Sequence, residues 1–66
     1  MIIRTEFELT HANNIVVTED FEVHTMSTFE TVGFVDALQT TAQLFGGELL
    51  SAFVIGEDGE IKSRIL

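Results

Sequence analysis

The sequence predicts an α+β fold, in which a small antiparallel sheet of four strands carries one helix on one face. Two segments near the N-terminus alternate apolar and polar residues with a period of two. A helix-capping signature then opens an apolar stripe with helical spacing, and two more strand-length segments flank a Gly-Glu-Asp-Gly turn. The ββαββ order, without a long linker, predicts a single compact domain over residues 1–66. The sequence leaves open whether the two hairpins share one sheet or the second pairs with another copy.

The first hairpin is predicted from strands over residues 2–9 and 15–24. The inward positions of the first strand are Ile3, Thr5, Phe7 and Leu9. Residues 11–14 include two asparagines, which tolerate left-handed backbone and therefore predict a turn. Glu19 has inward parity in the second strand, and a buried unpaired carboxylate is unfavourable. We therefore expect a bulge or local twist at residues 18–20 that turns Glu19 to water, or a turn there that splits the strand.

The helix is predicted to begin at Ser27, because Ser27 and Glu30 fit the S/T-x-x-E capping box. It should end at residues 46–47, two glycines that accept the left-handed cap conformation. Its inward stripe is Phe34, Val35, Leu38, Ala42 and Phe45. Met26 and Phe29 are expected to pack as a staple at the start of the helix, or to anchor an interface if they are exposed.

The second hairpin is predicted from an apolar run over residues 48–55 and an alternating segment over residues 60–66. In the latter, Ile61, Ser63 and Ile65 should share one face and Lys62, Arg64 and Leu66 the other. The turn lies at residues 56–59, where the Asp-Gly pair favours a type I′ turn with positive φ at both central positions.

Charge excludes several classes of function. The chain has 11 acidic and 3 basic residues and a formal net charge of −8. Nucleic-acid and anionic-membrane binding depend on Lys and Arg, so we expect neither. No apolar run approaches the roughly 20 residues that span a bilayer, and the first residues lack the pattern of a secretory signal, so we expect a cytoplasmic protein. With no cysteine, disulfides and thiolate metal sites are excluded.

Residues for catalysis or cofactor binding are scarce. The two histidines, His11 and His24, lie in a predicted turn and near a strand end, and neither has an evident acid-base partner. A metal site built from His24, Glu22 and Glu8 is conceivable, but the ligands lack helical i, i+4 spacing. No phosphate-binding loop or calcium loop is present. We therefore expect a protein that is not an enzyme and has no cofactor or metal.

Two surfaces are candidate binding sites for a partner. The outer face of the first hairpin should gather four carboxylates: Glu6, Glu8, Asp20 and Glu22. Carboxylates two residues apart along a strand are about 6.5 to 7 Å apart, which roughly matches the phosphate repeat of a nucleic-acid strand and permits DNA mimicry. An ordinary solvated face with a cross-strand pair from Arg4 to Asp20 or Glu22 explains them more simply.

The outer side of the helix is the second surface, and it carries little charge: Gly33, Asp36, Thr40 and Gln43. Small neutral residues permit close approach by another backbone, so this side is either a homodimer seam, a docking surface or a weakly charged solvent face. Gly33 lowers helix stability by up to about 1 kcal/mol relative to Ala, which suggests close packing there.

The leading hypothesis is a non-enzymatic binding module that docks on a basic host protein, one that handles nucleic acid, and inhibits or modulates it. In size and charge alone, the chain resembles small phage-encoded or mobile-element-encoded inhibitors and acidic antitoxin-like proteins. The alternatives are a homodimeric assembly protein and a DNA mimic.

Overall fold

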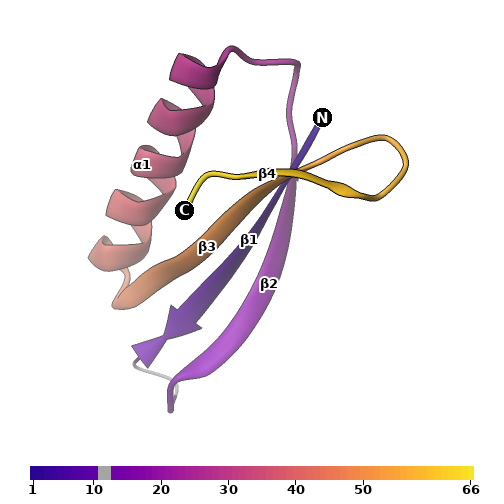
Figure 1. Ribbon diagram of the computed structural model, residues 1–66. Coiled ribbons are helices and arrows are strands. Elements are labelled where there is room, and N and C mark those ends of the chain that lie inside the picture. Colours follow the sequence, from indigo (N-terminus) through magenta and orange to yellow (C-terminus); the bar gives the residue numbers. More distant parts are fainter. Residues whose placement is uncertain (11–12) are drawn as a thin grey trace.

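The computed structural model describes residues 1–10 and 13–66 and has the predicted α+β architecture (Figure 1). Its elements are β1 (Ile2–Leu9), β2 (Ile15–Glu22), α1 (Thr28–Leu44), β3 (Gly47–Ile55) and β4 (Ile61–Arg64). All strand pairs are antiparallel, in the order β2-β1-β3-β4. The two hairpins therefore lie side by side in one sheet, joined through β1 and β3, which settles the question that the sequence left open.

The core lies between α1 and the two central strands. Ile3 of β1, Val35 of α1 and Leu49 and Ala52 of β3 form one buried cluster. Thr5 is fully buried beside them, and its hydroxyl donates to the Glu19 carbonyl at 2.8 Å, so the burial leaves no unpaired donor. The helix thus covers one face of the sheet, and in the described part of the chain no element packs on the other (Figure 1).

The bulge expected at residues 18–20 is absent, and this prediction is wrong. The β1–β2 register is continuous from Ile2 opposite Glu22 to Leu9 opposite Ile15. Glu19 keeps its inward parity but is exposed. β2 is an edge strand and α1 lies toward β3 (Figure 1). Glu19 therefore lies on the same face of the sheet as Ile3, but the helix covers Ile3 and leaves Glu19 exposed to solvent.

The register shifts lie instead where β3 pairs with β1 and with β4. One occurs opposite Glu6 and Phe7, where Leu50 is the extra residue, and it lets Leu49 and Ala52 face the same side although they are three positions apart. The other lies at Lys62, since Ile55 pairs with Ile61 and Val54 with Ser63. The alternation predicted for residues 60–66 is therefore wrong.

The C-terminal residues return to the core instead of extending β4. Ile65 and Leu66 lie beyond the strand and exchange backbone hydrogen bonds with Ala52. Both side chains pack against the core cluster, which adds apolar contacts that β4 itself, exposed along its whole length, does not make.

The helix starts as predicted, with both halves of the Ser27 and Glu30 capping box present. It ends at Leu44, and Gly46 has a φ of 77°, as expected for a left-handed cap. The inward assignment of Phe45 is wrong, because this side chain is 76% exposed. Met26 packs against the core cluster, whereas Phe29 is 88% exposed, which leaves for Phe29 the alternative of an exposed side chain. Both phenylalanines lie at the ends of the helix, beyond the edges of the core that it covers.

The second turn lies at residues 56–59 as predicted, and of the first predicted turn the structure describes Asn13 and Asn14 but not residues 11 and 12. Asn13 and Asn14 have φ values of 61° and 58°, the left-handed backbone expected of them. In the second turn only Gly59 has positive φ, at 83°, and its amide donates to the Gly56 carbonyl. The second turn is therefore not type I′, since Asp58 does not adopt positive φ.

Candidate functional site

The predicted carboxylates share one side of the sheet, the face opposite α1, which we call the open face. The parity of β1 and the cross-strand register place them there: Glu6, Glu8, Asp20 and Glu22. They are not equivalent. Arg4 donates to both carboxylate oxygens of Asp20, at 2.9 and 3.0 Å, so this one of the four has a cation within the molecule.

The Arg4–Asp20 pair changes the electrostatics of the part of the open face formed by β1 and β2. Its hydrogen bonds hold the pKa of Asp20 below the ordinary value of 3.8, so the carboxylate stays ionised at neutral pH. Both side chains are substantially exposed, and such surface pairs contribute little to stability. Arg4 also separates Glu22 from Glu6 with a positive charge, so the four carboxylates do not form an uninterrupted negative row.

A second group of carboxylates lies on the same face, where β1 ends and β3 begins. Glu48 of β3 is directly opposite Glu8 of β1, and Glu6 follows two positions along. We call Glu6, Glu8 and Glu48 the acidic cluster. Directly opposite side chains on antiparallel strands have Cβ atoms about 5 Å apart, and like charges in this arrangement repel. Glu6 accepts a hydrogen bond from the Ser51 hydroxyl at 3.2 Å, which orients one member of the cluster.

The basic side chains of the protein are all engaged elsewhere. Arg4 pairs with Asp20, and Lys62 pairs with Asp58 at 3.3 Å. Arg64 lies over the Phe53 ring, 5.6 Å from its centroid, and donates to the Leu66 carbonyl. These are the chain's only Lys and Arg residues, so the acidic cluster has no intramolecular ion pair among the described residues.

The sequence did not identify Glu48 as a site residue. It is the first residue of the apolar run predicted over residues 48–55, and nothing local indicates which strand lies beside it. The cluster exists because β1 and β3 pair, an arrangement that the sequence left open. A systematic comparison of all possible registers between residues 2–9 and 48–55 would have raised the Glu8–Glu48 pair as one of several possibilities.

The outer side of α1 is arranged as predicted. Gly33, Asp36, Thr40 and Gln43 are all exposed and lie on one side of the helix. A Cβ at Gly33 would have no atom within 4 Å, so close packing within the molecule does not explain this glycine. The surface remains a candidate without further support from the geometry.

An apolar groove runs between α1 and the β1–β2 side of the sheet. No pattern in the sequence predicted it. Its volume is about 310 Å³, and its apolar walls come from Phe7, Leu9, Phe21, Leu38, Ala42 and Phe45. No charged residue lines it, and the hydroxyl of its one polar side chain, Thr41, donates to the Ala37 carbonyl. The groove exists because the helix is centred toward β3 and leaves this side of the sheet uncovered.

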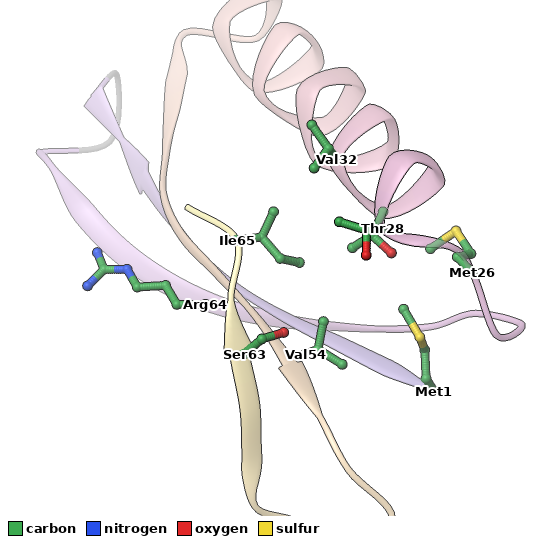
Figure 2. Close-up of a pocket in the computed structure, with 9 residues that line it drawn as sticks. Met1, Met26, Thr28, Val32, Val54, Ser63, Arg64 and Ile65 are labelled. Carbon is green, nitrogen blue, oxygen red and sulfur yellow. The ribbon is translucent and has the colours of Figure 1, made fainter.

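A second hollow, of about 440 Å³, opens between the start of α1 and the β3–β4 side (Figure 2). Val32, Thr28 and Ile65 border it from the helix and the C-terminus, while Arg64 points away (Figure 2). The hydroxyl of Thr31, also in its lining, already donates to the Ser27 carbonyl. Thr28 and Ser63 also line the hollow, so it combines apolar walls with hydroxyl groups, and no charged side chain of the described residues is directed into it (Figure 2).

Of the two histidines, the structure describes only His24. His11 lies outside the described residues. His24 is exposed, with Nε2 3.9 Å from Glu30 Oε2. Among the described residues, no three His, Asp or Glu side chains are grouped so that they could hold a metal ion.

No family model, curated protein or solved structure matches this chain. Within the described residues, no helix has both the length and the apolar character needed to cross a bilayer.

Proposed function

We propose that this protein is a non-enzymatic binding module whose open face docks on a basic protein. The observation that carries the proposal is the acidic cluster, three carboxylates on adjacent central strands that have no cation within the described molecule. A net charge of −8 on 66 residues would also steer a basic partner toward the module at long range.

The Glu8–Glu48 pair supports the binding of a basic partner at this face. Its repulsion is present in the free protein, and a Lys or Arg from a partner would remove it on binding. This gain in binding free energy requires a cation next to Glu8 and Glu48. If the partner uses the same basic surface to hold nucleic acid, docking blocks that surface, which is how the module would inhibit or modulate it.

The experiment is quantitative capture from a cell lysate with matched charge variants. E8Q/E48Q removes two charges from the acidic cluster, and E57Q/E60Q removes two exposed charges from the β3–β4 turn. We expect the first variant to lose the captured basic protein and the second to retain it. With that partner purified, the dissociation constant should weaken at least about tenfold in E8Q/E48Q and should also weaken as salt rises.

The proposal fails if the two variants capture equally, or if binding is insensitive to salt. DNA mimicry is the narrower form of the same idea, in which nucleic acid and this protein compete for one site on the partner. Arg4 interrupts the row of carboxylates on which mimicry depends, so the broader proposal has the better support. Competition with duplex DNA in the binding assay separates the two.

A further inference from the structure

We infer that the outer edge of β2 accepts an extended basic segment of the partner as an additional antiparallel strand, held by backbone hydrogen bonds. The inference rests on the proposed function for the basic character of the partner, and it adds the form that the partner takes at this edge. Three features carry it: the backbone groups that β2 directs away from β1, the regular geometry of this edge, and the charge along it.

Every second residue of β2 directs its backbone groups away from the sheet. Met1 and Val23 exchange both backbone hydrogen bonds, at 2.7 and 2.9 Å, which fixes the alternation of the β1–β2 pairing. The odd-numbered residues of β2 therefore bond to β1, and the Glu19 carbonyl, which accepts from the Thr5 hydroxyl, agrees with this. Four residues direct their N–H and C=O groups outward: Val16, Thr18, Asp20 and Glu22. Across residues 1–10 and 13–66, no strand pairs with this edge.

β2 lacks the features that usually protect an edge strand from pairing with another chain. Protected edges are short, bulged, or supplied with lysine or proline. β4, the other edge, is four residues long, carries Lys62 and Arg64, and adjoins a register shift. β2 is eight residues long, contains no lysine or proline, and pairs with β1 without a register shift. Of the two edges, only β2 is long and regular enough to bond to several residues of an added strand.

Charge selects a basic segment over a second copy at this edge. β2 carries three exposed carboxylates: Glu19, Asp20 and Glu22. Two more, Glu6 and Glu8, lie one strand further in on the open face, opposite Thr18 and Val16. The edge of a second copy would bring its own carboxylates against these, and like charges on neighbouring strands repel. Lys or Arg side chains would be attracted, so the same carboxylates disfavour one occupant and favour the other.

The two faces of β2 also specify the side-chain pattern of the segment. The carboxylates of Asp20 and Glu22 lie on the open face, whereas the helix face of β2 is mostly apolar: Ile15, Val17 and Phe21. Alternate residues of a strand lie on opposite faces, so the segment that fits alternates basic and apolar residues. Its basic residues then lie opposite the outward-directed residues of β2, and their own N–H groups donate to β2.

The test uses an acetylated and amidated octapeptide of alternating lysine and valine, with amide hydrogen exchange measured by NMR. In the free protein, the amides of the four outward-directed residues should exchange rapidly, and the octapeptide should protect them: Val16, Thr18, Asp20 and Glu22. Two octapeptides of equal charge are the matched controls. N-methylation of two lysines removes N–H groups directed at β2, whereas N-methylation of two valines removes N–H groups directed at solvent. We expect the first to bind at least about tenfold more weakly than the second.

Charge variants of the protein test the selection of a basic segment. E19Q/E22Q removes two carboxylates from β2, and E57Q/E60Q removes two from the β3–β4 turn. We expect the first variant to weaken octapeptide binding at least about fivefold more than the second, and binding to weaken as salt rises. Equal effects of the two variants would remove the charge argument and overturn the inference.

The outcomes separate this inference from the proposed function. If E8Q/E48Q loses the basic protein from the lysate but the octapeptide leaves the outward amides of β2 unprotected at millimolar concentration, the inference fails and the proposed function stands. If those amides become protected but lysate capture does not distinguish E8Q/E48Q from E57Q/E60Q, the proposed function fails and strand addition at β2 stands.

Two further results would overturn the inference. The first is equal affinity for the two N-methylated octapeptides, which would mean that charge alone holds the peptide. The second is protection of the outward amides in the free protein that increases with protein concentration, which would assign the edge of β2 to a second copy.

Discussion

Glu8 and Glu48 lie directly opposite each other on β1 and β3, on the face of the sheet that α1 does not cover. The pair forms because the two hairpins join through these central strands. Elsewhere on this face Arg4 pairs with Asp20, whereas in the described part of the chain no Lys or Arg pairs with Glu8 or Glu48.

Reversing the charge at Glu48 should stabilise the free protein. In E48K a repulsive cross-strand pair becomes attractive, and we expect the free energy of unfolding to rise by about 1 kcal/mol. Urea denaturation at pH 7 and low salt measures the change. E57K makes the same change of net charge in the β3–β4 turn, and an equal gain there would mean that overall charge, not the Glu8–Glu48 contact, is responsible.

Removing the cap of α1 should destabilise the protein. The Ser27 hydroxyl accepts from the Glu30 amide, and S27A leaves that donor without its protein partner. The free energy of unfolding should fall by about 1 kcal/mol, the usual effect of losing a Ser cap. T28A, one position further along, removes an exposed hydroxyl and should change little. If both substitutions have the same effect in urea denaturation, the capping box does not contribute to stability.

The protein should lose stability in acid through named carboxylates. The Ser27 amide lowers the pKa of Glu30 below its ordinary value of 4.5, and the Arg4 guanidinium lowers the pKa of Asp20 below 3.8. A carboxyl group whose pKa is lower in the folded state stabilises that state above its unfolded pKa, and this contribution disappears as pH falls through the folded pKa. Stability should therefore decline below about pH 4.5.

The variant D20N tests the contribution of Asp20 to that decline. Urea midpoints at pH 7 and pH 3 should differ less in D20N than in the wild-type protein, because the variant lacks one of the groups that must be protonated. An unchanged difference would show that the Arg4–Asp20 pair is not coupled to folding.

Two glycines should respond oppositely to alanine. Gly33 is in the middle of α1, and the space that an added Cβ would occupy is open, so G33A should raise the free energy of unfolding by about 1 kcal/mol. Gly59 has a φ of 83°, where an alanine is strained, so G59A should lower it by about 1 to 2 kcal/mol. Thermal or urea denaturation at one fixed protein concentration measures both. A destabilising G33A would indicate that a second molecule packs closely against the outer side of the helix.

The order of elements, the start of the helix and both turn positions could be predicted from the sequence. Each depends on signals that lie within a few residues of one another: the two-residue alternation of β1, the Ser27 and Glu30 capping box, and the left-handed residues Asn13 and Asn14. Local backbone sterics and hydrogen bonds decide these features, so the residues that carry them are neighbours in the chain. The shared face of Glu6, Glu8, Asp20 and Glu22 follows in part from the same alternation.

The tertiary structure alone decided which strands are central and which are edges, and the binding surfaces depend on that. Pairing of β1 with β3 brought Glu48 opposite Glu8, and the position of α1 toward β3 exposed Glu19 and Phe45 and opened the apolar groove. The physical reason is that periodicity assigns each side chain to one face of its own element. What lies over that face is set by residues far away along the chain, through contacts that no local pattern encodes.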